Sequence, residues 1–389
     1  MCQIYPTKEL LKAHRHEVLD NLKYLIKDSV LNEQITLTPN NISLYSSSDS
    51  TNVSTNLYSD INHPTPFSPQ GYGKPLTGLK VAIDPGHTAN SFESAQIEGK
   101  FVSLSKGKQT CEIYESRSTW LVGMTLKHLL ENQGAEVLIT RSELENDTKG
   151  HDFPYWVENR AQIEIDSLYS NDLIDSMRFD FLTKCLADTS VRKNKKALFK
   201  YAYNIIDIEN RAKIINNFEP HLTIVIHFNV DVNNSGWTSP TKQNFNMVFT
   251  PGAFMERELQ TFEGINYFND LLFSARIRKS HKLGALILKN LNNSLQMAPL
   301  IDDEQVQYLT LYSLKSNYYG VYSRNLSLTR KIKSPLCYGE TIYQDHWKSC
   351  TDLAKKDINF EGYLINQTIY EIASGYFRGI KEYLEYEFE

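Results

Sequence analysis

Residues 79–84 alternate between apolar side chains and other side chains, and Pro85-Gly86 ends the run. Alternation with a period of two, followed by Pro-Gly, predicts a short strand that leads into a tight turn. His87 therefore follows the carboxyl end of a strand, where α/β sheets hold their ligands. A neutral imidazole at this place can bind a metal or transfer a proton, and it can equally be fixed by a turn hydrogen bond.

Two periodicities, one of two residues for strands and one of about 3.6 residues for helices, divide the rest of the chain into alternating helices and strands. Apolar residues at helical spacing predict helices over residues 7–27, 115–134, 204–217, 271–295 and 365–385. Apolar or alternating runs predict strands over residues 135–141, 222–229, 245–250, 325–329 and 336–339. This alternation of elements predicts an α/β domain built on a mostly parallel or mixed sheet.

The polar stretches between these elements predict the domain organisation. Residues 1–35 form an N-terminal helical segment, whose helix we expect to pack on the main domain rather than on a membrane. Residues 36–75 are rich in Ser, Thr, Asn, Pro and Gly, which predicts a flexible linker before a domain that spans 76–389. Within that domain we expect a polar loop over 88–112 and an inserted helical pair over about 142–203.

Composition excludes some classes of function. The net charge of −5 gives no basic face for nucleic acid, and no apolar run approaches the ~20 residues of a transmembrane helix. The five cysteines lack zinc-type pair spacing, and their odd number argues against a fully paired disulfide framework. Cys2 follows Met1 directly and could carry a lipid anchor, although a plain N-terminal cysteine is the commoner case.

Four side chains at the ends of predicted elements have the chemistry of a metal site. His87, His227 and Glu340 follow strands or end them, and Glu115 lies in the first turn of a helix. Two imidazoles and one carboxylate are the ligands of a catalytic zinc that keeps one position open. A second carboxylate can move the proton that hydrolysis requires. The pattern therefore predicts hydrolysis of an amide or ester, with the convergence of the four residues left open.

The chain also resembles a known family, the zinc-dependent N-acetylmuramoyl-L-alanine amidases of the type 3 class, which cut bacterial peptidoglycan. Five stretches carry the resemblance, and they occur in the order of the family. They are residues 81–87 (VAIDPGH), Glu115 with the helix to Gly134-Ala135 and residues 138–141 (LITR), Arg211-Ala212 with Asn216, residues 224–229 (IVIHFN), and residues 335–340 (PLCYGE). Together they span roughly residues 79–141 and 204–345.

The resemblance implies a role for each matching position. His87, Glu115 and His227 would bind Zn²⁺, and Glu340 would be the catalytic base and acid; Asn229 and Arg211 are expected to contact the substrate. The implied fold is a twisted, roughly six-stranded mixed sheet flanked by helices, and the implied reaction cuts the bond between N-acetylmuramic acid and L-alanine. The resemblance also implies export to the periplasm or cell envelope, with no signal segment in this sequence, and it leaves open a protein activator.

Some positions depart from the family or allow another assignment. Thr88-Ala89, Phe228 and Thr341-Ile342 replace the residues usual beside the two histidines and after the catalytic glutamate, which puts the preferred stem peptide in doubt. Glu112 competes with Glu115 as a ligand, but the distance to Gly134 favours Glu115. Cys111 and Cys337 could supply thiolate ligands, and we expect both to be packing residues. For Asn229, a turn-capping role is as plausible as a substrate contact.

Two questions of function stay open at this level. The acidic stretch 254–269, with Glu256, Glu258 and Glu263, is either a solvated segment or a lid whose carboxylate occupies the open zinc position, and the solvated segment is favoured. The alternatives to an amidase are a zinc peptidase that cuts elsewhere in the stem peptide and an inactive wall-binding regulator with the same fold.

Overall fold

Seven strands form one mixed sheet at the centre of the chain, in the order β10-β11-β9-β12-β8-β4-β7. Their bounds are β4 (Lys80–Pro85), β7 (Glu136–Ile139), β8 (Leu222–Asn229), β9 (Met247–Thr250), β10 (Ser313–Lys315), β11 (Val321–Arg324) and β12 (Leu336–Tyr343). Strands β7, β4, β8 and β12 are parallel to one another, whereas β9 is antiparallel to β12. The predicted mixed α/β sheet is confirmed, with seven strands in place of about six.

This arrangement comes from a computed structural model of the chain. The residues that it describes are 8–27, 35–37, 41–45, 52–56, 67, 73–144, 147–234, 236, 238–301 and 306–388.

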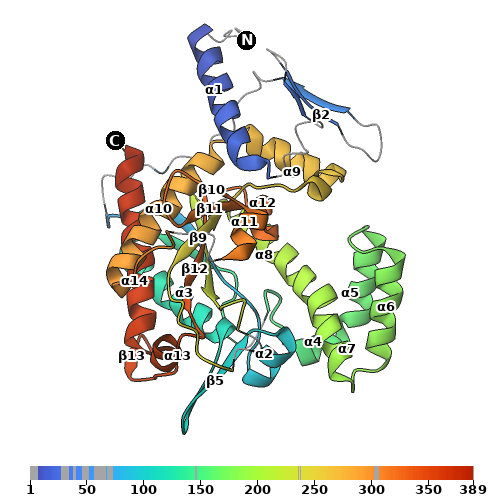
Figure 1. The fold of residues 1–389 in the computed structure, drawn as a ribbon, viewed down its shortest axis with the longest axis vertical. Coiled ribbons are helices and arrows are strands. Elements are labelled where there is room, and N and C mark those ends of the chain that lie inside the picture. Colours follow the sequence, from blue (N-terminus) through green and yellow to red (C-terminus); the bar gives the residue numbers. More distant parts are fainter. Residues whose placement is uncertain are drawn as a thin grey trace.

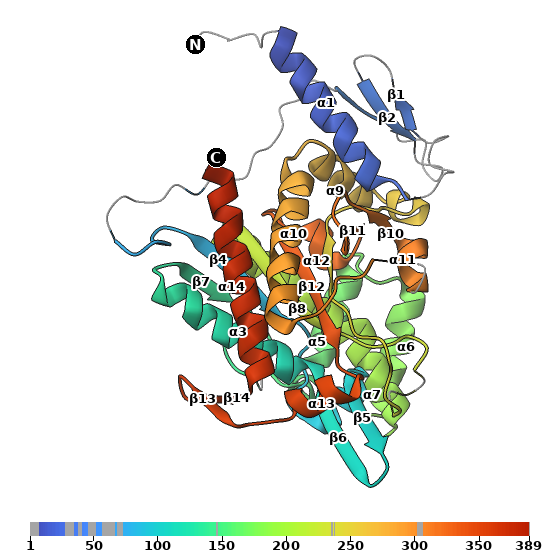
Figure 2. The ribbon, with the colours of Figure 1, turned by 60° about the vertical axis from the view of Figure 1, so that its left-hand side comes forward.

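Helices cover both faces of the sheet (Figure 2). On one face lie α3 (Glu115–Asn132), α10 (Arg276–Leu295) and α14 (Gln367–Phe388), whose apolar side chains form the largest hydrophobic core with those of β4, β8 and β12. On the other face, α8 (Asn204–Phe218) and α12 (Ser327–Lys331) pack through Ile215 and Leu328 onto Val225. The helix α11 (Gln307–Tyr312) covers a further cluster with β9. A sheet buried on both faces explains why β8 is apolar along nearly its whole length.

The strand predicted over 325–329 is wrong. Strand β11 ends at Arg324, and Ser327–Lys331 is the helix α12. The hydroxyl of Thr329 accepts a hydrogen bond from the backbone N–H of Leu326 at 2.9 Å. This cap satisfies an N–H group at the start of the helix, which no strand neighbour would do.

The insert over 142–203 contains more helices than the predicted pair. They are α4 (Phe153–Asn159), α5 (Ala161–Ser170), α6 (Ser176–Ala187) and α7 (Arg192–Leu198), followed by the π-helix η2 (Phe199–Tyr203), which runs into α8. The side chains of Asp152 and Asp175 accept backbone N–H groups at the starts of α4 and α6, so each begins a new helix. The insert has its own hydrophobic core around Trp156 and Tyr203, and it lies beside the main body in Figure 1.

The predicted polar loop over 88–112 is also wrong, because it contains a helix and a hairpin. Ser91 caps the helix α2 (Phe92–Glu98), and Gly99 ends it with a positive φ of 80°. The strands β5 (Phe101–Lys106) and β6 (Gln109–Tyr114) then pair as an antiparallel hairpin. This segment returns the chain to the sheet edge at which α3 begins.

The N-terminal helix α1 (Lys8–Leu25) packs on the main domain, as predicted. Val18 and Leu25 are buried against residues of α9 (Phe262–Leu272) and the segment before it, which includes the short helix η4 (Glu256–Leu259). The side-chain amide of Asn21 donates to the carbonyls of Leu272 and Ser274, both at 2.9 Å. Among the described residues, no helix has the length and hydrophobicity needed to cross a membrane.

A three-stranded antiparallel sheet falls within the range predicted as a linker. It consists of β1 (Ile35–Leu37), β2 (Asn41–Tyr45) and β3 (Asn52–Asn56), which the composition of this range did not lead us to expect. Apart from residues 67 and 73–75, the rest of the predicted linker lies outside the described residues, as does Cys2. The domain boundaries stay a prediction.

A disulfide joins Cys111 in β6 to Cys350 in α13 (Trp347–Leu353), across 239 residues of sequence. The prediction that Cys111 is a packing residue is therefore wrong, because the hairpin lays β6 against α13, which the sequence spacing does not show. Cys337 is a free thiol in the main core, as expected. After α13, β13 (Ile358–Phe360) and β14 (Tyr363–Ile365) form a second hairpin before α14.

Candidate functional site

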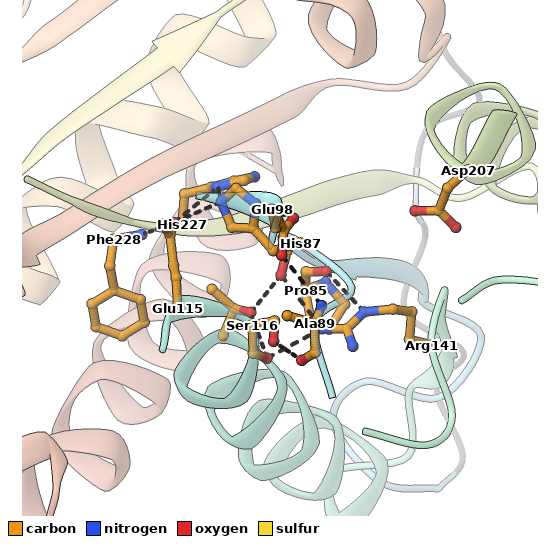
Figure 3. Close-up of polar contacts among 12 residues, drawn as sticks. Pro85, His87, Ala89, Glu98, Glu115, Ser116, Arg141, Asp207, His227 and Phe228 are labelled. Carbon is orange, nitrogen blue, oxygen red and sulfur yellow. Dashed lines mark hydrogen bonds and ion pairs between the residues drawn. The ribbon is translucent and has the colours of Figure 1, made fainter. Parts of the chain in front are cut away.

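Three of the predicted residues converge at the carboxyl ends of β4 and β8 (Figure 3). Nε2 of His87 lies 3.0 Å from Oε1 of Glu115, and Nδ1 of His227 lies 3.1 Å from the same oxygen. The two imidazole nitrogens are 3.1 Å apart. The three ligand atoms all lie within 4.8 Å of one another, so the site brings together two imidazoles and one carboxylate.

His87 takes a backbone conformation that few residues adopt, with φ at +67°. The residue before it must be a glycine, because a Cβ on Gly86 would lie 2.3 Å from the imidazole of His227. The Pro-Gly sequence therefore does more than end the strand. It lets the two histidines approach each other closely enough to share one ion.

Two buried arginines hold the turn that carries His87. Arg211 donates to the backbone carbonyls of Pro85 and His87 at 2.6 and 2.9 Å, and it pairs with the carboxylates of Asp84 and Asp207. Arg141 donates to the carbonyls of Gly86 on the turn and Ser116 in α3, at 3.4 and 3.2 Å. Because protein acceptors occupy most of its guanidinium, Arg211 is placed to position the turn, and the predicted substrate contact stays a prediction.

Glu115 is almost fully buried at the first position of α3, at 1% exposure. Oε1 accepts the backbone N–H of Phe228 at 3.0 Å, and Oε2 accepts the side-chain amide of Gln344 at 3.2 Å. The competing Glu112 instead accepts the hydroxyl of Ser103 on the exposed β5–β6 hairpin. The structure therefore brings Glu115, and not Glu112, to the two histidines.

Glu98, at the end of α2, holds the other side of the His87 ring. Its Oε1 lies 2.9 Å from Nδ1 of His87, and its Oε2 accepts the backbone N–H of Ala89 at 3.2 Å. A carboxylate on one ring nitrogen fixes the tautomer and the orientation of a metal-binding histidine. Nδ1 of His87 is thus held as a donor, and Nε2 faces Glu115 and His227.

The charges in this cluster are coupled. Burial alone would lower the pKa of His87, but the Glu115 and Glu98 carboxylates raise it to about 9. Burial would raise the pKa of Glu115, whereas His87 and Lys100 hold it well below its usual range. Burial lowers the pKa of His227 to about 4, so this imidazole is neutral at pH 7. The cluster therefore keeps a proton on His87 that a divalent cation would displace.

Glu340 lies in β12 directly beside His227 of β8 in the strand register. Tyr338, two residues earlier, stacks on the His227 ring with the centroids 4.6 Å apart and the planes 4° from parallel. Burial, with the charge of Glu115, raises the pKa of Glu340 to about 8, although Lys100 and Arg324 act against this shift. No hydrogen bond or ion pair holds the Glu340 carboxylate among the described residues, so it is available to a reactant.

The donor set fits a zinc ion. Two imidazole nitrogens and one carboxylate oxygen face one another with no group between them, and a second carboxylate lies beside them. Such a set leaves a coordination position open, as catalytic zinc sites do. Each ligand is itself held by the protein, through Glu98 for His87, Gln344 for Glu115 and Tyr338 for His227.

A cleft of about 450 Å³ opens onto this cluster. One wall carries His87, Glu98 and Lys100, and the opposite wall is formed by η2, α8 and α12. The residues of that opposite wall include Phe199, Lys200, Asn204, Ile208, Leu326, Ser327 and Leu328. The helical insert therefore contributes to the cleft directly.

In the acidic stretch over 254–269, the carboxylates of Glu258 and Glu263 contact residues other than the metal ligands. Oε2 of Glu258 accepts the amide of Asn325 at 2.7 Å, and Glu263 pairs with Lys331 at 3.2 Å. Glu263 and Glu258 are thus engaged at α12 and the turn before it. This arrangement favours a packed segment over a lid.

Asn229 lies two residues beyond His227, as expected, and its side-chain oxygen contacts the backbone. It is buried two residues beyond His227, its own Oδ1 accepts the backbone N–H of Val230, and its Nδ2 has no acceptor in hydrogen-bonding geometry. A substrate contact stays a prediction. The functional residues that sequence reasoning missed are Glu98, Lys100 and Gln344. All three lie in segments interpreted as loop or left without an assignment.

A sequence model of the N-acetylmuramoyl-L-alanine amidase family matches residues 81–361. No curated protein matches the chain.

Several solved structures resemble the chain at low identity. The CwlD amidase of Clostridioides difficile, in complex with the GerS lipoprotein, has 15% identity and a TM-score of 0.40, covering 79% of this chain and 100% of that one. Ami1 of Mycobacterium smegmatis, an N-acetylmuramyl-L-alanine amidase, has 13% identity and a TM-score of 0.42, covering 80% and 99%. The catalytic domain of CwlV from Bacillus (Paenibacillus) polymyxa has 14% and 0.39, covering 79% and 98%. Similarity this low assigns no role to any residue.

Proposed function

The chain belongs to the N-acetylmuramoyl-L-alanine amidase family, and we propose that it uses zinc to hydrolyse the amide bond between N-acetylmuramic acid and L-alanine in peptidoglycan. The observation that carries the zinc dependence is the convergence of His87, Glu115 and His227, with Glu340 beside them. These are the residue types that a zinc hydrolase requires, at the sheet edge where its water and substrate have access.

The protein's own side chains would perform the proton transfers. Zinc held by the three ligands supplies Lewis acidity at neutral pH. Glu340 takes the proton from the attacking water and returns it to the leaving amine, a role that suits a carboxyl group with a pKa near the working pH. Burial and the charge of Glu115 raise the pKa of Glu340 to about 8. A divalent cation on the three ligands would oppose this shift and so would favour the carboxylate that acts as the base.

The same proposal places the protein outside the cytoplasm, in the cell envelope or periplasm. Its substrate would be found there, and the Cys111–Cys350 disulfide suits an oxidising compartment. A lipid anchor at Cys2 and a protein activator stay predictions from the sequence.

Mass spectrometry of muropeptides tests the proposal. Purified sacculi are digested with the zinc-loaded protein, with the chelated protein and with the chelated protein to which zinc has been restored. We expect free stem peptides that begin with L-alanine in the first and third digests only. Fragments cut elsewhere in the stem would identify a peptidase, and no fragments from a folded, zinc-loaded protein would identify a wall-binding regulator.

A further inference from the structure

Arg324 lies near enough to the catalytic carboxylate Glu340 to act on its pKa, yet its guanidinium makes no ion pair among the described residues. The guanidinium of Arg324, at the end of β11, contacts two neighbouring aromatic rings, 4.8 Å from the centroid of Phe249 and 4.7 Å from that of Tyr308. None of its N–H groups has a hydrogen-bond acceptor or an ion pair among the described residues, and the residue is partly exposed. The rings stabilise the cation through cation–π contacts, which use none of its N–H groups.

Two buried arginines of this chain are held differently. Arg211 and Arg276 each have a carboxylate within 3 Å and also donate to backbone carbonyls. Their charges are compensated inside the protein, which is how a structural arginine is normally held. Arg324 contacts two aromatic rings instead, and its hydrogen-bonding capacity is left for another molecule.

Arg324 lies on the same face of the sheet as the catalytic residues. Phe249 pairs with Tyr322 of β11 and with Tyr338 of β12. Arg324 and Glu340 each lie two residues further along strands that run in opposite directions, so they share a face of the sheet but lie on opposite sides of this row. Ring contacts lead from Phe249, which Arg324 contacts, to the metal ligand His227. The ring centroids of Phe249 and Tyr338 are 6.1 Å apart, and those of Tyr338 and His227 are 4.6 Å apart. The metal ligands, the catalytic carboxylate and the stacked guanidinium therefore follow one another across one face.

A second polar side chain, Asn229, meets the Tyr308 ring that Arg324 contacts. The amide of Asn229 is buried next to the Tyr308 hydroxyl, and its Nδ2 has no acceptor in hydrogen-bonding geometry. Leaving a buried donor without an acceptor costs about as much as a lost hydrogen bond. Arg324 and Asn229 both lie at Tyr308 and offer N–H groups that are not saturated by protein acceptors, which is the complement of an anion.

We propose that Arg324, with Asn229 and Tyr308, forms a subsite that binds a free carboxylate of the stem peptide. The inference rests on the proposed function, which fixes the direction of the substrate. Glu340 must protonate the leaving amine, so the peptide side of the bond lies on the Glu340 side of the metal ligands. Two peptide residues extend about 7 Å from that nitrogen. A stem-peptide residue near the cut bond can therefore place its carboxylate towards the guanidinium.

The test compares two muramoyl peptides that differ in one group, a free carboxylate or a carboxamide on the second residue of the stem. The wild-type zinc enzyme should cut the carboxylate form with a kcat/KM about 10- to 100-fold higher, because charge-assisted bidentate pairs are the strong ones. R324Q should lose this preference through KM and keep the zinc content of the wild type. Because Arg324 also acts on the pKa of Glu340, any change in kcat should be the same for both peptides. R324K, which keeps the charge without the planar fork, should restore part of it.

Two further variants make the outcome specific. Lys200→Gln removes a cation from the opposite wall of the cleft, and Arg330→Gln removes a nearby arginine in α12 that does not line the cleft. Both should keep the preference of the wild type. A preference that survives in R324Q, or that disappears in K200Q instead, overturns the proposal, as does a wild type that cuts both peptides equally.

Calorimetric binding of the released stem peptide separates this inference from the proposed function. The folded wild-type protein should bind the carboxylate form more tightly than the carboxamide form, and R324Q should bind both equally, whether or not any amide is cut. If the protein cuts neither muramoyl peptide but shows this difference in binding, the proposed reaction fails and the subsite stands. Equal binding of the two forms by the wild type rejects the subsite alone.

Discussion

Oε1 of Glu98 lies 2.9 Å from Nδ1 of His87, and this contact determines which nitrogen of the ring faces the other metal ligands. Glu98 is itself fixed, since its second oxygen accepts the backbone N–H of Ala89 on the same turn. The side chain is only 4% exposed, so water competes little for the bond. The helix α2, which the sequence did not predict, thus orients His87, a ligand that the sequence did predict.

Replacing Glu98 by Gln should therefore weaken zinc binding. Outer partners of metal-binding histidines typically contribute 10- to 100-fold in metal affinity or activity, and we expect a loss in this range for E98Q, measured by competition with a chelator of known affinity. Glu93→Gln, an exposed change on the same helix, serves as the matched control and should keep the wild-type affinity. Equal affinities of E98Q and wild type would show that the contact does not orient His87.

The roles of the two catalytic-site glutamates separate in a second pair of variants. Glu340→Gln should retain zinc and lower turnover by about 10²–10⁴-fold, the usual contribution of a positioned general base. Glu115→Gln should lose zinc, because it removes the oxygen that faces both imidazole nitrogens. Metal content per chain and kcat, measured on the same preparations, check both statements. Loss of zinc from E340Q would reverse the assignment of base and ligand.

The sequence predicted the parts of the site that depend on local patterns. His87 and His227 follow apolar strands, and Glu115 begins an amphipathic helix, so periodicity alone put all three at element ends. Their convergence then follows from the parallel order of β4 and β8, because the carboxyl ends of parallel strands meet at one edge of a sheet. The pattern itself left this convergence open, and the resemblance to the amidase family supplied the roles of the three residues as ligands.

The residues around the ligands depend on contacts between distant segments, which patterns do not encode. Glu98 reaches His87 only because the Ser91 cap and the Gly99 turn bend α2 back over the strand end. Gln344 reaches Glu115 across 229 positions, after an irregularity in β12 at which Ile342 has a φ of 40°. The Cys111–Cys350 pair likewise joins segments 239 residues apart. Each requires the assembled fold before the partner can be named.

The disulfide leads to a third prediction, on stability. It closes a loop of 239 residues between the hairpin before Glu115 and the helix after Gln344. Crosslinks of native domains typically contribute about 2–5 kcal/mol, in part by restricting the unfolded chain. Cys111→Ser should lower the free energy of unfolding by an amount in this range, measured by urea denaturation. A reducing agent should destabilise the wild type to a similar extent and leave C111S unchanged; a further loss in C111S would mean that the reductant acts elsewhere.

A buried histidine outside the metal site gives a fourth prediction, on the pH dependence of stability. His281 in α10 is 5% exposed, its Nε2 lies 2.9 Å from the hydroxyl of Ser323, and its ring meets the edge of Tyr24. Burial lowers its pKa to about 4, with no charged neighbour contributing. The folded state therefore resists a proton that the unfolded chain accepts at its ordinary pKa of 6.5.

Stability from this group should be fully present above pH 6.5 and should be lost as the pH falls from 6.5 towards 4, because the unfolded state then binds more protons. A shift of this size corresponds to at most about 3 kcal/mol. Urea denaturation of the metal-free protein between pH 4.5 and 7.5 should give a shallower pH slope for His281→Gln than for wild type. His16→Gln, which changes an exposed histidine of α1, should keep the wild-type slope. Parallel slopes for wild type and H281Q would show that His281 binds its proton equally well in the folded and unfolded chain, contrary to its burial between α10, β11 and α1.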